Sequence, residues 1–183
     1  MARLILINGA PASGKSTLAR RYAEDHPLTL VLDIDVVRGM LGRWIDTPSD
    51  AGILARRLAL RMAAEHLTGG HDVVVPQALA RIDFLLQLDT LATELGVPFV
   101  EIALVSSAAD AVRRFAWRSA HPEDDTHRDA AALQERGGGA DEIATMYARI
   151  MAVVGERPAT HLVETVDGDI DGTYARLLAA IAM

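Results

Sequence analysis

Along this chain, short runs of aliphatic residues alternate with longer segments in which apolar residues recur every three or four positions. The short runs have the length of buried strands, and they cover residues 4–7, 28–32, 73–75, 99–105 and 161–166. The longer segments have the periodicity of amphipathic helices, and they cover residues 15–24, 36–41, 49–66, 81–95, 108–119 and 170–181, with one more around 143–154. Strands that alternate with helices predict a parallel sheet covered on both faces. We therefore expect an α/β fold.

Two of the predicted helices carry further detail. For the longest one, Ser49 or Asp50 has the side chain of an N-cap, and Gly69-Gly70 ends the pattern. The apolar residues at helical spacing within it are Ile53, Leu54, Leu58, Ala59, Met62 and Leu67. The helix before the fifth strand places on one side Ile143, Met146, Tyr147, Ile150 and Val154.

The length of 183 residues is that of one domain that can bury a core without covalent staples. We expect a single domain over residues 1–183. The segment from about 119 to 140 is polar and contains the Gly137-Gly138-Gly139 run, so it is predicted to be a mobile lid with a glycine hinge. His121 and His127, which lie in this segment, are interpreted as solvated residues and not as a metal-binding pair.

Composition narrows the possible functions. There is no cysteine, which excludes disulfides, zinc–thiolate sites and a cysteine nucleophile. No apolar stretch approaches the roughly 18 residues of a membrane span, and the N-terminus lacks the pattern of a signal peptide. We expect a soluble, cytoplasmic protein without a membrane partner. A net charge of −7 argues against general nucleic-acid binding.

The most informative motif is the run from Gly9 to Ser16, which matches the phosphate-binding pattern G-x-x-x-x-G-K-[ST]. It follows the first predicted strand and opens the first predicted helix, the context that this motif requires. Lys15 is the only lysine beside 17 arginines, and an ammonium fits between β- and γ-phosphates better than a forked guanidinium. Ser16 offers a hydroxyl to Mg²⁺. The predicted nucleotide-binding residues are Gly9, Ala10, Pro11, Ala12, Ser13, Gly14, Lys15, Ser16 and Thr17.

The rest of the sequence excludes two large classes of nucleotide-binding protein. A signalling GTPase needs an [NT]-K-x-D loop, but the only asparagine is Asn8 and the only lysine is Lys15. A motor ATPase needs an acid after a hydrophobic strand, whereas the third strand ends in Pro76-Gln77. A small phosphotransferase remains.

Asp35 and Arg38 follow the second predicted strand, beside the phosphate loop in a parallel sheet. A carboxylate there would orient an acceptor hydroxyl and take its proton, so Asp35 is the predicted general base. Arg38, three residues later on the same helical face, would hold an anionic group of the acceptor. Asp33 is a competing base, but at the end of the strand it is assigned with Ser16 to Mg²⁺. The alternative is an Asp35 that caps a short helix beside a surface Arg38.

Together, Gly9–Thr17 and Asp35-Val-Val-Arg38 resemble the small P-loop kinases, a group of AAA_33-type ATP-binding proteins that includes polynucleotide 5′-hydroxyl kinases, zeta-type toxin kinases and chloramphenicol phosphotransferase-like enzymes. The resemblance implies a three-layer fold with strand order 2-3-1-4-5, and ATP with Mg²⁺. It implies that Asp35 is the base and that Arg38 binds acceptor or phosphate. It also implies lid arginines after the fourth strand, which Arg114 and Arg118 fit.

The arginines of the helix at 108–119 can also be interpreted physically. Arg114 and Arg118 are i,i+4 neighbours, and two guanidiniums there would stabilise charge on a transferring phosphoryl group. Whether Arg113, Arg114 or Arg118 does so stays open. The alternative is a solvated arginine face paired with the acids at 123–125.

The acceptor is the least defined part of the prediction. Four residues follow the second and third strands and are expected at the rim of the acceptor site: Arg43, Trp44, Gln77 and Arg81. Trp44 would stack on a ring or fill the core, and Gln77 would hydrogen-bond a hydroxyl. The set suits a small polar, anionic molecule. Two other functions stay open: a polynucleotide 5′-hydroxyl kinase, and an ATP-binding switch that transfers nothing.

Overall fold

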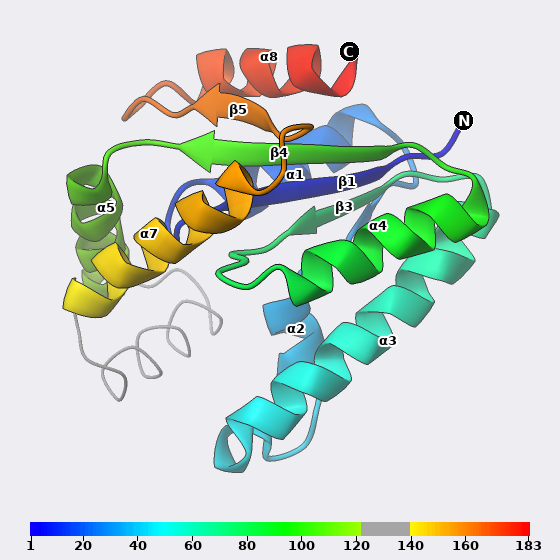
Figure 1. The fold of residues 1–183 in the computed structure, drawn as a ribbon, viewed down its shortest axis with the longest axis horizontal. Coiled ribbons are helices and arrows are strands. Elements are labelled where there is room, and N and C mark those ends of the chain that lie inside the picture. The colour runs from blue at the N-terminus through cyan, green and yellow to red at the C-terminus, as the bar shows by residue number, and fades with distance from the viewer. Residues whose placement is uncertain (122–139) are drawn as a thin grey trace. The chain divides into compact units, whose positions relative to one another are not determined.

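A computed structural model of the chain describes residues 1–121 and 140–183. The five strands are β1 (Leu4–Gly9), β2 (Leu30–Val31), β3 (Val73–Pro76), β4 (Phe99–Val105) and β5 (His161–Glu164). The helices are α1 (Lys15–Asp25), α2 (Ile34–Gly39), the 3₁₀ turn η1 (Trp44–Asp46), α3 (Pro48–Thr68), α4 (Asp83–Leu95), α5 (Ala108–Ala120), α7 (Ala140–Gly155) and α8 (Ile170–Ile181). The strands form one sheet in the order β2-β3-β1-β4-β5, which confirms the predicted α/β fold and strand order (Figure 1).

Most of the predicted lid, residues 122–139, lies outside the described residues. The Gly137–Gly139 hinge and His127 fall in this part. None of the described helices combines the length and apolar character that crossing a bilayer requires.

The chain divides into two compact, interleaved units, of which the first comprises residues 1–7, 16–77 and 82–101. Here β3 pairs with β1 on one side and with β2 on the other, both in parallel. The register places Ile7 opposite Pro76 and Val31 opposite Val74, so that the carboxyl ends of the three strands reach the same edge. Helix α3 packs against α2 and α4, and α3 and α4 lie side by side in Figure 1. Within this unit, the segment after β2 and Gln77 after β3 therefore follow the carboxyl ends of neighbouring strands.

Three predicted features of this unit are wrong in detail. β2 covers only Leu30–Val31, because Leu28 adopts a left-handed φ of 65° and the Thr29 N–H closes a turn onto His26. Helix α2 begins at Ile34, two residues before the predicted start, because the Asp33 side chain caps it. Neither Ser49 nor Asp50 caps α3, since the helix already begins at Pro48, a residue suited to the first helical turn.

The buried face of α3 also differs from what its apolar spacing indicates. The buried residues are Ala51, Ala55, Ala59, Ala63 and Leu67, one every fourth position. Small side chains let the helix pack closely against its neighbours. The larger apolar residues of the same helix are exposed: Ile53, Leu54, Leu58 and Met62. Periodicity thus predicted the helix correctly, but it did not predict which side is buried.

The second unit comprises residues 8–15, 78–81 and 102–183. Within it β4 and β5 pair in parallel, with Ala103 opposite Leu162. Helices α5 and α7 pack together (Figure 1). On α7, Ile143, Ile150 and Val154 are buried and the Tyr147 hydroxyl donates a hydrogen bond to the Ser106 carbonyl. The predicted inward face of this helix is therefore confirmed.

A charged network ties the start of β1 to the segment before β3. Asp72 Oδ2 accepts hydrogen bonds from Arg3 Nη2 at 2.9 Å and from the Tyr22 hydroxyl at 2.7 Å, and Asp72 Oδ1 accepts from the Arg3 backbone N–H at 2.8 Å. Burial opposes ionisation of this carboxyl, but the bonds from Tyr22 and Arg3 outweigh it and lower the pKa of Asp72. The network links α1 with the amino ends of β1 and β3.

Replacing Asp72 by Asn should lower the free energy of unfolding by about 1.5–3 kcal/mol at neutral pH, the range for hydrogen bonds to a charged group. Because the folded pKa lies below the unfolded one, the stabilisation is complete above about pH 4 and is lost as the pH falls through the folded value. Urea denaturation of both proteins at several pH values checks this. If the difference in the free energy of unfolding between the two proteins stayed the same in acid, the charged network would be contradicted. Asp83→Asn, at an exposed position in the first turn of α4, is the control.

Candidate active site

The phosphate loop takes a backbone conformation that its sequence explains. Gly9 has φ of 152° and Gly14 has φ of 92°, both in the region that favours glycine. A Cβ on Gly9 would lie 2.9 Å from Ser13 Oγ and 3.0 Å from the Leu104 carbonyl oxygen, too close for any side chain. At Gly14 the space beside the backbone is open within 4 Å. Ala12, with φ of 62°, adds a third left-handed residue. The loop thus curls tightly at Gly9 and leaves its backbone open at Gly14.

Two polar side chains of this loop point inward. Lys15 is 9% exposed, and its Nζ donates a 2.7 Å hydrogen bond to the Ala10 carbonyl across the loop. Ser13 Oγ is buried without a hydrogen-bond partner among the described residues. A buried hydroxyl without a partner costs free energy that a bound ligand would recover. The loop is therefore suited to bind a chain of phosphates, through the Lys15 ammonium, the Ser13 hydroxyl and the open backbone at Gly14.

Asn8 is a residue of this site that sequence reasoning missed. It is 2% exposed, and its Oδ1 accepts hydrogen bonds from the N–H groups of Gly9 at 2.8 Å and Leu79 at 2.9 Å. Asn8 therefore fixes the first residue of the phosphate loop to the segment that follows β3. The available signal was that the only asparagine of the chain directly precedes Gly9. Its partner Leu79 is 71 residues away, which no local pattern indicates.

Replacing Asn8 by Ala should lower the free energy of unfolding by about 2–4 kcal/mol, because two buried N–H groups lose their acceptor. Affinity for nucleotide should fall as well, because the loop loses its anchor. Ser107→Ala is a matched control that removes the single side-chain cap of α5, and it should cost about 1 kcal/mol. Thermal denaturation with and without ATP measures both effects. Equal losses in the two variants would contradict the role of Asn8.

Ser16 and Asp33, the two predicted metal ligands, are in contact. The Ser16 hydroxyl donates to Asp33 Oδ2 at 3.3 Å, and Asp33 Oδ1 accepts from the Asp35 N–H at 2.9 Å. Burial, and to a lesser extent the charge of Asp35, raises the pKa of Asp33. A nearby cation would stabilise the negatively charged form of this buried carboxyl group. Among the described residues no group of three or more His, Asp or Glu could hold a metal alone. A hydroxyl and one carboxylate fit a Mg²⁺ ion that takes its other ligands from phosphate and water.

Asp35 and Arg38 form an ion pair in the first two turns of α2. Arg38 Nη1 lies 3.0 Å from Asp35 Oδ1, and the Arg38 guanidinium carbon lies 4.5 Å from the centre of the Trp44 ring. The Asp35 side chain is 41% exposed whereas that of Arg38 is 17% exposed. Arg38 Nε is buried and has no hydrogen-bond partner within the described part of the chain. The arginine is thus clamped between a carboxylate and an indole, with one donor unused.

The other predicted acceptor residues have different surroundings in the structure. Gln77 belongs to the same unit as Asp35, and its Oε1 is buried without a partner among described residues. Arg43 is on the surface, with its side chain 89% exposed and ion-paired to Asp46 at 2.8 Å. Arg81 is exposed and belongs to the second unit. The structure therefore brings together Asp35, Arg38 and Trp44, and it gives no such contact to Arg43 or Arg81.

The three candidate lid arginines have different contacts. Arg113 and Arg114 both hydrogen-bond to the Asp167 carboxylate, whose pKa these two bonds lower. Arg114 also donates to Thr165 Oγ1 at 2.8 Å and to the Thr165 carbonyl at 3.2 Å. Arg118 has its guanidinium carbon 5.4 Å from the centre of the Phe115 ring. Arg113 and Arg114 thus attach α5 to the loop after β5, and a nucleotide-binding role for Arg114 and Arg118 stays a prediction.

The chain matches the model of one protein family, AAA_33, described as an AAA domain, over residues 4–137. The matched part includes the phosphate loop, Asp33, Asp35 and α5. No curated protein has a sequence that matches this chain.

Solved structures share the fold at low sequence identity. A gluconokinase from Sinorhizobium meliloti 1021 has a TM-score of 0.63 and 17% identity, over 97% of this chain and 90% of its own. The tunicamycin resistance protein of Deinococcus radiodurans has a TM-score of 0.61 and 14% identity, over 100% and 97%. A chain of the Pnkp1/Rnl/Hen1 RNA repair complex has a TM-score of 0.67 and 15% identity, over 86% of this chain and 47% of its own. The fold is that of P-loop kinases.

Proposed function

Because the chain belongs to the AAA_33 family of AAA domains, we propose that it is an ATP-dependent phosphotransferase that moves the γ-phosphate of ATP to a hydroxyl of a small polar molecule. The observation that carries this proposal is a continuous series of contacts. Ser16 of the phosphate loop bonds to Asp33, Asp33 accepts from the Asp35 backbone, and Asp35 pairs with Arg38. The series connects the nucleotide loop with a carboxylate suited to activate an acceptor.

The phosphate loop would bind the nucleotide. Its open backbone at Gly14 and the Ser13 hydroxyl would contact phosphate oxygens, and the N-terminus of α1 adds a partial positive charge. Lys15 would exchange its bond to the Ala10 carbonyl for the β- and γ-phosphates. Ser16 and Asp33 would hold Mg²⁺, which neutralises charge that develops on the transferring phosphoryl group.

Asp35 would act on the acceptor. Its side chain is the more exposed member of the ion pair with Arg38 and is free to face a hydroxyl. As the hydroxyl oxygen bonds to the γ-phosphorus, its proton passes to the Asp35 carboxylate and the bond from phosphorus to the ADP oxygen breaks. Arg38 would hold Asp35 in position through its Nη1.

The unused polar atoms support a particular kind of acceptor. Arg38 Nε is a buried donor and Gln77 Oε1 a buried acceptor, each without a partner among the described residues. A molecule with an anionic oxygen and several hydroxyls would satisfy both. Since one structural relative is a gluconokinase, sugar acids lead the candidate acceptors for this chain.

The test is a panel of acceptors, each assayed for faster release of ADP. The panel contains sugar acids, neutral sugars, nucleosides, hydroxylated antibiotics including tunicamycin, and an RNA with a 5′-hydroxyl end. Acceleration of about tenfold or more by one hydroxyl compound, and none by its deoxy analogue, supports the proposal. Slow hydrolysis that no acceptor changes would favour the ATP-binding switch instead.

The polynucleotide 5′-hydroxyl kinase makes a separate prediction. Strand binding requires several phosphate contacts, while this chain has 25 acidic and 18 basic residues. We expect no measurable affinity for a single-stranded RNA of about ten nucleotides at about 150 mM salt. Fluorescence anisotropy measures it, and micromolar binding with a steep salt dependence would move this alternative to first place.

A further inference from the structure

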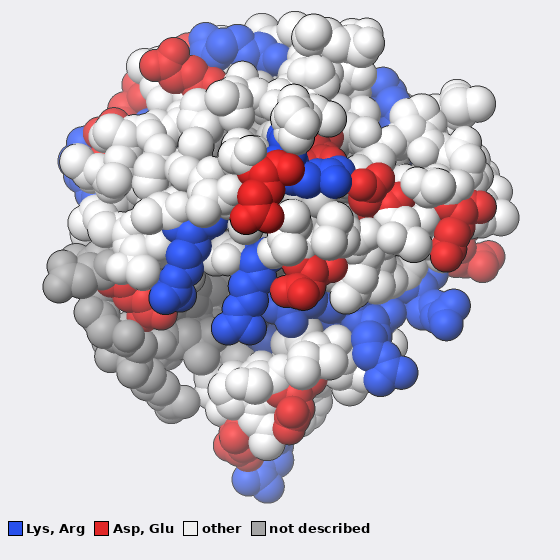
Figure 2. All heavy atoms as spheres, in the orientation of Figure 1, with Lys and Arg blue, Asp and Glu red and all other residues white. Residues whose placement is uncertain are grey.

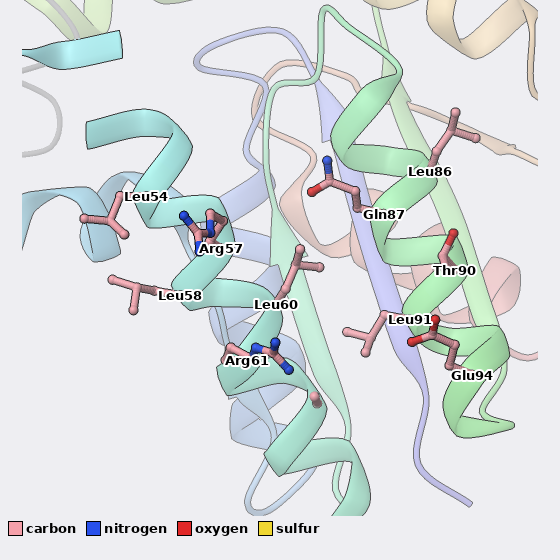
Figure 3. A pocket seen from close by; sticks show the side chains of 11 residues that line it. Leu54, Arg57, Leu58, Leu60, Arg61, Leu86, Gln87, Thr90, Leu91 and Glu94 are labelled. Atoms are coloured by element: carbon pink, nitrogen blue, oxygen red, sulfur yellow. The ribbon is translucent and has the colours of Figure 1, made fainter. Parts of the chain in front are cut away.

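Helices α3 and α4 enclose an apolar groove on the surface of the first unit. The cavity has a volume of about 560 Å³. Its walls carry five leucines, Leu54, Leu58, Leu60, Leu86 and Leu91, and its rim carries Arg57, Arg61, Gln87 and Glu94. Figure 3 shows Leu60 on α3 and Leu91 on α4 at the gap between the two helices. The groove lies on helices that supply none of the residues predicted for the nucleotide or the acceptor.

Several leucines of this groove are largely exposed, although α3 buries alanines on its opposite side. Leu54, Leu58 and Leu86 are 43%, 41% and 43% exposed, and Met62 beside them is 39% exposed. Helix α3 thus turns its small residues inward and its large apolar residues outward. Large apolar residues that are exposed along one groove are typical of an interaction surface.

The charges at the rim indicate which partner fits. Arg57 and Arg61 lie on α3, whereas Glu94 lies on α4. None of the three forms an ion pair with any of the described residues, although they face a common groove. Figure 2 shows that basic and acidic side chains both reach the surface on the face that carries these helices. One helix therefore offers positive charge and the other offers negative charge, which makes the surface complementary to itself.

We propose that this groove is the docking surface for a second copy of the chain, related by a twofold axis along the groove. Helices α3 and α4 run in the same direction, and Figure 3 places Arg61 and Glu94 at one end of the groove and Leu54 and Leu86 at the other. A twofold axis parallel to both helices lays α3 of each copy over α4 of the other. Arg61 of one copy then meets Glu94 of the second copy, twice, and the leucines pack between them.

The available area agrees with a weak dimer. Because α3 of each copy lies over α4 of the other, the 13 residues of α4 limit the length of the contact, and the two outer faces cover about 400 Å² per copy at 1.5 Å rise per residue and about 10 Å width each. The total of about 800 Å² is below the standard size of a specific interface. We expect a dimer that dissociates in the micromolar range.

Sedimentation velocity from about 1 to 200 µM, a range that brackets micromolar dissociation, tests the proposal on the full chain. Arg61→Glu and Glu94→Arg should each weaken the dimer by about tenfold or more, because like charges then meet across the interface. The double exchange Arg61→Glu with Glu94→Arg should restore it to within about threefold of the wild type. Arg56→Glu, on the same helix but outside the groove, is the control and should change nothing.

Leu58→Arg gives an independent arm, because this exposed position accepts a charge without entering the core. It should leave the melting temperature unchanged and produce a monomer. A chain that stays monomeric over the whole range would overturn the proposal and leave the groove to a different partner. A dimer whose dissociation constant is unchanged by both charge reversals and by Leu58→Arg would also overturn the proposal, since the interface would then lie elsewhere.

Discussion

Lys15→Met should reduce kcat by about a thousandfold or more, a loss of about 4 kcal/mol in transition-state stabilisation. The reason is that Lys15 is the only lysine of the chain and its ammonium is held inside the phosphate loop, 2.7 Å from the Ala10 carbonyl. Methionine has similar length and no charge, so the fold should persist with an unchanged circular dichroism spectrum. Steady-state kinetics of ATP consumption with the best acceptor measures the effect.

Lys15→Arg separates charge from shape in the same assay. The guanidinium keeps the charge but is wider and forked, and the loop has room for a compact ammonium. We expect most of the activity to be lost in this variant too. A Lys15→Met enzyme that retains more than about a tenth of kcat, a loss under about 1.4 kcal/mol, would contradict the assignment of Lys15 to the γ-phosphate.

Asp35→Asn should lower kcat by about 10² to 10⁴, the range for removal of a general base, and leave the KM for ATP within about threefold. Asp35 acts on the acceptor, so its loss affects the transfer step and spares nucleotide binding. The isosteric amide also keeps the shape of the first turn of α2. Initial rates at varied ATP and varied acceptor separate the two parameters.

Two further variants make this prediction specific. Asp33→Asn should instead weaken nucleotide binding in the presence of Mg²⁺, since Asp33 bonds to the hydroxyl of Ser16. Asp46→Asn, in the 3₁₀ turn η1 and ion-paired with Arg43, should have no effect. If Asp33→Asn abolished kcat while Asp35→Asn spared it, Asp33 would be the base and the proposed roles would be exchanged.

Local sequence was sufficient for much of the fold. The phosphate loop depends on glycines at two left-handed positions, and the pair Asp35–Arg38 depends on i,i+3 spacing within one helix. Both are properties of a few neighbouring residues. The sequence predicts the loop and places Asp35 and Arg38 on one helical face, although it did not predict the ion pair between them. The strand order followed from a resemblance and not from local pattern, and it was also correct.

Contacts between distant residues could not be predicted in the same way. Asn8 is hydrogen-bonded to Leu79, which lies 71 residues later in the sequence, and Arg114 is hydrogen-bonded to Thr165, 51 residues later. The short β2 depends on a left-handed Leu28, a conformation that a leucine rarely adopts. The outward face of α3 results from close packing of its alanines, which apolar spacing alone does not reveal.

The most direct measurement of phosphoryl transfer uses ATP labelled in the γ-phosphate, incubated with the protein, Mg²⁺ and the acceptor that best accelerates ADP release. We expect the label to appear in a phosphate monoester of that acceptor, in a one-to-one ratio with ADP, and we expect Lys15→Met to form none. Label found only in inorganic phosphate, at the same rate with and without acceptor, would contradict phosphoryl transfer by this protein.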